Sequence, residues 1–144
     1  MGRSIRVDLT WSAPKGHEDF KKEPGRGPAG LYVIIAGKRI AGKWNKGTFK
    51  LVDVGQAGDI HLRVAEHERE DCWHPRARGS SLLVKIAELP DEYDEADRRA
   101  LVCCLRAAER PPCGSECNDG YRRDESVEIS NRGDAAPLRS QYVS

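Results

Sequence analysis

The chain has 144 residues, of which 38% are hydrophobic and 33% are charged, a size and composition typical of one soluble globular domain. No apolar run approaches the roughly 20 residues that a membrane-spanning helix needs, which excludes insertion into a membrane. The N-terminal residues lack the apolar segment of a secretory signal, so a cytoplasmic location is expected. Five cysteines are an odd number that does not indicate a paired framework, and reduced thiols are expected.

The net charge of +1 conceals a difference between two parts of the chain. Residues 1–90 carry 16 Lys and Arg against 11 Asp and Glu, whereas residues 91–144 carry 8 against 12. An anionic partner is therefore expected to bind the first part.

The chain opens with a segment that alternates apolar and polar residues from Ile5 to Trp11 and then becomes rich in Pro and Gly. Residues 1–28 are predicted to be an N-terminal extension with an edge strand and a long loop. Two strands of the core sheet are predicted at 31–36 and 49–55, where β-branched residues are frequent.

The segment between these two strands is basic, with five Lys or Arg, three glycines and no acidic residue in AGKRIAGKWNKGTFK. Its length predicts an inserted hairpin. Lysines that neutralise phosphates, together with a ring available for stacking, are typical of a nucleic-acid groove. The alternative is a solvated hairpin whose Trp44 covers the sheet. The residues expected to bind nucleic acid here are Lys38, Arg39, Lys43, Trp44 and Lys46.

The second half of the chain contains two helical patterns. One runs over 59–71 with Asp59 as its N-cap, and the other runs over about 92–109 and is stopped by two prolines. A third core strand is predicted between them at 80–89. Residues 119–144 are polar without sustained periodicity and are predicted to be a disordered tail.

Two short motifs are separated by a specific spacing. GLY at 30–32 is followed by VDVGQAGDIHLRVAEH at 52–67, in which an arginine lies eight residues after Gly55 and a histidine lies four residues later. This pattern resembles the GIY-YIG nuclease domain, over residues 29–118. The resemblance implies a small α/β domain with a mixed or antiparallel three-stranded core sheet, flanking helices and, here, the inserted hairpin. It also implies a metal-dependent DNA endonuclease that uses Mg²⁺ or Mn²⁺ and binds duplex DNA.

The residue types suit phosphodiester hydrolysis, which requires a deprotonated water and positive charge around a pentavalent phosphate. Tyr32 is expected to act as the base or its relay, and Arg63 to bind the phosphate through two parallel hydrogen bonds. His67 would lie on the same helical face as Arg63. Gly55 would let the substrate backbone approach the turn that follows its strand.

Three positions depart from the family pattern. The tyrosine that opens the second motif is Asp53 here, and the family's metal-binding glutamate and its asparagine fall on Val102 and Gly114. One hypothesis is that Asp53 supplies the metal-binding carboxylate. The alternative function is a catalytically inactive module of the same fold that binds DNA or a protein partner.

Other roles stay open for several of these residues. Tyr32 on its own would pack its ring in the core, and Arg63 on its own would be a solvated helix arginine paired with a nearby acid. The cysteines also permit a zinc site. Its ligands would be Cys72, His74, Cys113 and Cys117.

Overall fold

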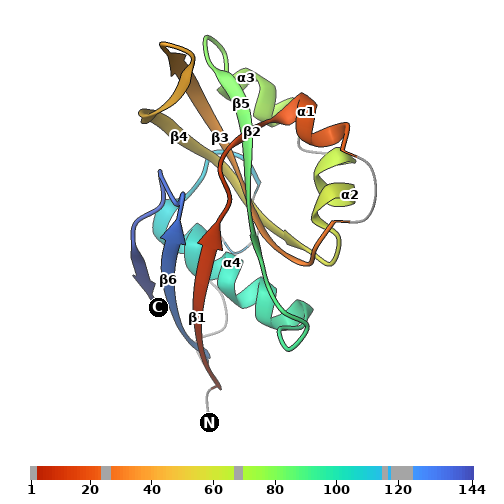
Figure 1. Cartoon of the computed structure of the whole chain (residues 1–144). Coiled ribbons are helices and arrows are strands. Elements are labelled where there is room, and N and C mark those ends of the chain that lie inside the picture. The colour runs from red at the N-terminus through yellow and green to blue at the C-terminus, as the bar shows by residue number, and fades with distance from the viewer. Residues whose placement is uncertain (1–2, 24–26, 67–69, 115–116, 118–124) are drawn as a thin grey trace.

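The structure, a computed structural model, describes residues 3–23, 27–66, 70–114, 117 and 125–144 (Figure 1). Two β-sheets and several helices make up this part of the chain, which confirms the prediction of a small α/β domain. The elements are β1 (Arg3–Trp11), β2 (Lys15–Gly16), α1 (His17–Lys21), β3 (Gly30–Ile40), β4 (Lys43–Ala57), α2 (Ile60–Ala65), α3 (Glu70–Arg76), β5 (Ser81–Glu88), α4 (Glu95–Glu109), β6 (Glu125–Gly133) and β7 (Gln141–Val143).

The three predicted core strands are neighbours in a four-stranded antiparallel sheet with the order β2-β5-β3-β4. In the central strand β3, Leu31 and Val33 belong to one apolar cluster, whereas Tyr32 and Ile34 belong to another. Successive side chains of a strand point to opposite faces, so both faces of the sheet are covered. This double burial explains why β3 is continuously apolar rather than alternating.

Different elements cover the two faces of this sheet. Side chains from β1, β6 and α4 form the first cluster with one face, and side chains from α1, α2 and α3 form the second cluster with the other. Figure 1 shows α4 on the same side of the sheet as β1 and β6.

The basic insertion is a continuation of β3 and β4 and is called the basic hairpin (residues 37–50) below. Lys38 pairs with Asn45 and Ile40 pairs with Lys43, so the two strands continue to a two-residue turn. That turn is Ala41 and Gly42, with φ of 54° and 79°. Positive φ at both positions is the geometry of a type I′ turn, whose twist matches that of the flanking strands.

A second sheet joins the two ends of the chain in the order β1-β6-β7. β1 and β6 are parallel and in register along their whole length, and β7 pairs with β6 antiparallel. Where the sequence predicts a disordered tail over 119–144, residues 125–133 and 141–143 are therefore strands. Val127 and Ile129 are completely buried and alternate with polar residues, but this short alternation does not reveal the parallel partner near the other end of the chain. The predicted long loop of 1–28 likewise contains β2 and α1.

The helices begin at side-chain caps. Asp59 is the N-cap of α2, as predicted, and its carboxylate accepts a hydrogen bond from the backbone N–H of Leu62 at 3.1 Å. α4 starts with a reciprocal capping box between Asp94 and Asp97. The helix predicted over 59–71 corresponds to α2 and α3, two separate helices. Among the described residues, no helix has the length and apolar character that crossing a membrane requires.

Four cysteines form disulfides, which corrects the expectation of reduced thiols. Cys72 in α3 is bonded to Cys113, and Cys103 in α4 is bonded to Cys117, whereas Cys104 is a buried free thiol. The chain beyond α4 returns to β4, where the backbone N–H of Cys113 donates to the carbonyl of Val52 at 3.0 Å. Since three of the proposed zinc ligands are bonded to other cysteines, the predicted cysteine zinc site is not formed.

Candidate functional site

A pocket of about 600 Å³ lies between the end of β4, α2 and α4. Tyr32, Gly55 and Arg63, which the sequence identifies by their spacing, all line this pocket. Two further arginines, Arg98 and Arg99, reach it from α4. We call it the arginine pocket.

Tyr32 and Gly55 face each other as paired residues of β3 and β4. A Cβ atom added to Gly55 would overlap the hydroxyl oxygen and the ring of Tyr32, so the ring packs directly over the glycine backbone. Tyr32 is only 1% exposed. The need for glycine at this position is therefore steric: it leaves space for the tyrosine ring against the strand.

The arginine side chains differ in how firmly they are held. Arg98 donates from Nε to the side-chain oxygen of Gln56 at 3.0 Å and from one terminal nitrogen to the carbonyl of Tyr93 at 3.3 Å. Arg99 forms an ion pair of 3.2 Å with Glu95, and both side chains are more than half exposed. The guanidinium of Arg98 is thus fixed in place, whereas that of Arg99 is accessible to a ligand.

The helical spacing of α4 explains why these side chains meet. Glu95, Arg98, Arg99 and Val102 recur at intervals of three and four residues and line the pocket together. Val102 occupies the position where the sequence resemblance expects a glutamate, and it lines the pocket with an apolar side chain. Glu95, Arg98 and Arg99 lie seven, four and three residues before Val102, which is the spacing of one helical face. This spacing is the sequence signal that places them in the same pocket as Val102.

Asp53 lies outside the residues that line the arginine pocket. Its side chain is completely buried, and one carboxylate oxygen accepts hydrogen bonds from Arg106 and from the backbone N–H of Val54, both at 2.8 Å. The other oxygen accepts a hydrogen bond of 2.7 Å from the indole N–H of Trp73. These donors assign Asp53 to a network within the core instead of to a metal in the pocket.

The described residues of the arginine pocket do not fit a Mg²⁺ or Mn²⁺ ion. Mg²⁺ requires an octahedral set of oxygens and is usually held by one or two carboxylates with substrate phosphates. Within the described lining, Glu95 is the single carboxylate, and it is paired with Arg99 among three guanidinium groups. This excess of positive charge favours an anion over a cation, and we derive no step through a metal here.

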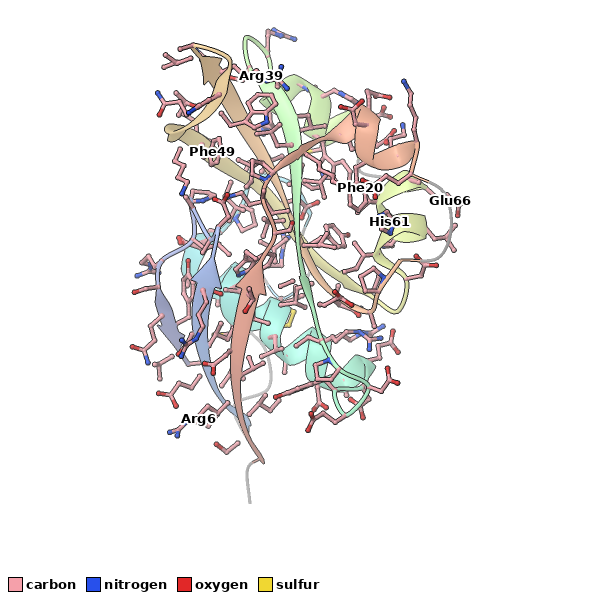
Figure 2. All side chains as sticks on the ribbon, viewed as in Figure 1. Arg6, Phe20, Arg39, Phe49, His61 and Glu66 are labelled. Carbon is pink, nitrogen blue, oxygen red and sulfur yellow. A yellow bond between two sulfur atoms is a disulfide. The ribbon has the colours of Figure 1, made fainter. Side chains whose placement is uncertain are left out.

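The remaining predicted site residues lie elsewhere. His67 is outside the described residues. The residues of the basic hairpin lie farther along the sheet, because Lys38 follows Tyr32 by six positions, or about 20 Å of strand. Figure 2 shows Arg39 near the end of this hairpin, away from α4. Its guanidinium lies 4.3 Å from the centre of the half-buried Trp44 ring, and Lys46 lies 3.7 Å from Asp134.

Comparison with family models, with curated proteins and with solved structures finds no match to this chain. A function must therefore be argued from the chemistry of these residues.

Proposed function

We propose that this protein is a GIY-YIG-like module that binds nucleic acid, with duplex DNA as its partner, and that the arginine pocket holds a backbone phosphate. The observation that carries the proposal is that Tyr32, Gly55 and Arg63 line one pocket with Arg98 and Arg99. The first three belong to the motifs that resemble the GIY-YIG family, and the other two add charge of the sign that a phosphate needs.

The chemistry of the pocket suits a phosphodiester. Its two non-bridging oxygens match the forked donors of a guanidinium, which can form two parallel hydrogen bonds. Three arginines against the single Glu95 give the described lining residues a net positive charge. Arg98 is already held by Gln56 and by the carbonyl of Tyr93, so binding immobilises less of its side chain. Tyr32 forms part of the pocket wall with a side chain that is only 1% exposed.

The basic hairpin extends the proposed binding surface. A separation of about 20 Å along β3 corresponds to roughly six nucleotides of one DNA strand, at 3.4 Å each. One duplex can therefore reach both the arginine pocket and the hairpin. The exposed lysines Lys38 and Lys43 are suited to contact phosphates, while Arg39 stacks on Trp44.

The test is equilibrium binding of a fluorescently labelled DNA duplex, measured by anisotropy. We expect Arg63→Ala and Arg99→Ala each to weaken binding about tenfold, because each removes a charged hydrogen bond to phosphate. The matched control is Arg132→Ala on β6, whose side chain is 68% exposed and lies away from the pocket. Equal affinity of all four proteins would contradict the proposal, and a chain that binds no duplex would favour a protein partner.

The second candidate function is a DNA endonuclease. It is favoured by Tyr32 and Arg63 lining one pocket, since hydrolysis needs both proton transfer and charge stabilisation at phosphorus. The prediction of Mg²⁺ or Mn²⁺ belongs to this candidate. A supercoiled plasmid incubated with either ion distinguishes the two functions: nicking that is lost in Arg63→Ala supports the nuclease, and binding without nicking supports the inactive module.

A cytoplasmic location stays a prediction. Disulfides persist mainly in oxidising compartments, and the chain contains two of them. The bonds therefore weigh against the prediction, and fractionation of expressing cells tests it.

A further inference from the structure

A second group of chemically reactive side chains lies apart from the arginine pocket. His17 and Glu18 at the start of α1 and His74 in α3 each bring one ligand atom to within 4.8 Å of the others. They line an open pocket that also includes Asp19 and the stacked pair of the basic hairpin. α1 and α3 lie at the same end of the sheet (Figure 1).

His17 is the buried member of this group. It is 2% exposed, and its ring packs edge-on against the rings of Trp73 and His74, with centroids 5.6 Å and 5.5 Å away. Within the described residues, neither of its ring nitrogens makes a hydrogen bond. A buried imidazole with two unsatisfied nitrogens is costly, so each such group calls for a partner.

Two carboxylates lie close to these nitrogens without hydrogen-bond geometry. Nδ1 of His17 is 3.8 Å from a carboxylate oxygen of Glu18, and Nε2 is 3.1 Å from one of Glu70. The Glu70 oxygen is also 3.0 Å from the ammonium group of Lys21. Nδ1 therefore lies nearer to Glu18, one of the potential ligands, and Nε2 lies beside Glu70, whose carboxylate is also paired with Lys21.

We propose that His17, Glu18 and His74 bind a Zn²⁺ ion. Two imidazoles and one carboxylate are ligands that zinc takes in proteins, whereas Mg²⁺ and Ca²⁺ prefer oxygen ligands alone. Three protein ligands leave one position of a four-coordinate ion for water or an anion. The ion would satisfy His17 and link α1 to α3.

Glu70 would act in this site as a positioning residue once its carboxylate, 3.1 Å from Nε2, accepts a hydrogen bond from that nitrogen. A carboxylate that accepts the second ring N–H of a zinc-bound histidine fixes its tautomer and orientation. With Glu70 beside Nε2, the nitrogen left for the metal is Nδ1, the one that faces Glu18. Lys21 holds the carboxylate in turn.

The experiment is titration of the 144-residue chain with zinc chloride by isothermal calorimetry, after removal of metals and without added thiols. We expect one Zn²⁺ per chain, with affinity that falls about tenfold in Glu70→Gln and further in His74→Ala and Glu18→Gln. Asp19→Asn is the matched control, because Asp19 lines the same pocket but is not in the group of ligands. Its affinity should equal that of the unmodified chain.

His74 and Glu18 are exposed, so their replacement leaves the core intact, and near-ultraviolet circular dichroism of each variant verifies the fold. Titration with Co²⁺ gives an independent readout, because its visible absorption reports imidazole coordination. Failure of the folded chain to bind Zn²⁺ would overturn the inference. So would an affinity that His74→Ala and Glu18→Gln leave unchanged. Neither result depends on DNA binding, so this test stands apart from that of the arginine pocket.

Discussion

Asp53 in β4 and Arg106 in α4 form an ion pair of 2.8 Å in which neither side chain has any exposed surface. Arg106 also donates to the carbonyls of Val54 and Cys113, and Asp53 accepts the indole N–H of Trp73. The pair therefore connects β4 to α3, to α4 and to the segment that follows α4. The ion pair neutralises two buried charges, one on β4 and one on α4, and both elements also contribute residues to the lining of the arginine pocket.

Asp53→Asn is expected to lower the free energy of unfolding by about 3–5 kcal/mol, because it removes the carboxylate charge that is paired with the buried Arg106 guanidinium. Urea denaturation followed by tryptophan fluorescence measures the loss. The exposed Asp91→Asn is the control and should change stability by less than about 0.5 kcal/mol. Equal stability of the two variants would show that the pair is not needed for folding.

Gly55→Ala is expected to destabilise the protein by about 1–3 kcal/mol and to weaken DNA binding, because the added Cβ overlaps the Tyr32 ring. Gly58→Ala is the matched control in the same pocket, where the nearest atom to an added Cβ is on Arg98 at 3.8 Å. Thermal unfolding compares the two variants. If both were equally stable, the proposed packing of Tyr32 against Gly55 would be contradicted.

The disulfide between Cys72 and Cys113 encloses a sequence separation of 41 residues and should contribute about 2–4 kcal/mol to stability. A double variant, Cys72→Ala with Cys113→Ala, should therefore unfold at lower urea concentration. Adding a reductant should destabilise the unmodified chain more than the double variant. A thiol count on denatured, unreduced protein provides the control: we expect Cys104 alone to react, and five reactive thiols would refute both disulfides.

Lys85 is completely buried, and its ammonium group donates to Asp134 and to the carbonyl of Ala136. Burial lowers the pKa of Lys85 below its usual value, an effect that Asp134 opposes. The folded chain thus releases this proton at lower pH than the unfolded chain, so the unfolded chain binds more protons in the interval between the two pKa values. Stability therefore rises with pH across that interval.

The direction of this pH dependence of stability can be measured by comparing the unmodified chain with Lys85→Met. The difference in unfolding free energy, unmodified minus variant, should increase as the pH rises toward 10.5, the usual pKa of lysine. Lys50→Met, at an exposed position on β4, is the control variant. A difference that falls as pH rises would mean that the pKa of Lys85 is raised by folding.

The sequence predicts the elements that carry strong local patterns. The apolar run of β3, the cap at Asp59 and the stripe of α4 that includes Leu101 and Leu105 are all visible in short windows. Tyr32, Gly55 and Arg63, which the resemblance to the GIY-YIG motifs indicates, line one pocket.

The features that the sequence does not reveal depend on contacts between distant residues. β6 pairs in parallel with β1, so Val127 is buried by residues near the other end of the chain. The choice of Cys113 as the partner of Cys72 depends on how the chain turns after α4. From the sequence, Asp53 is a candidate metal ligand. In the folded chain, its carboxylate oxygens accept hydrogen bonds from Arg106 and Trp73, which are distant in the sequence.

The most direct test of the proposed phosphate pocket is the salt dependence of duplex binding by the unmodified chain, Arg63→Ala and Arg132→Ala. Loss of one phosphate contact reduces the slope of log affinity against log salt concentration by about one. We expect that reduction in Arg63→Ala and an unchanged slope in Arg132→Ala. A slope near zero for the unmodified chain, or the same slope in all three proteins, would contradict phosphate binding in the arginine pocket.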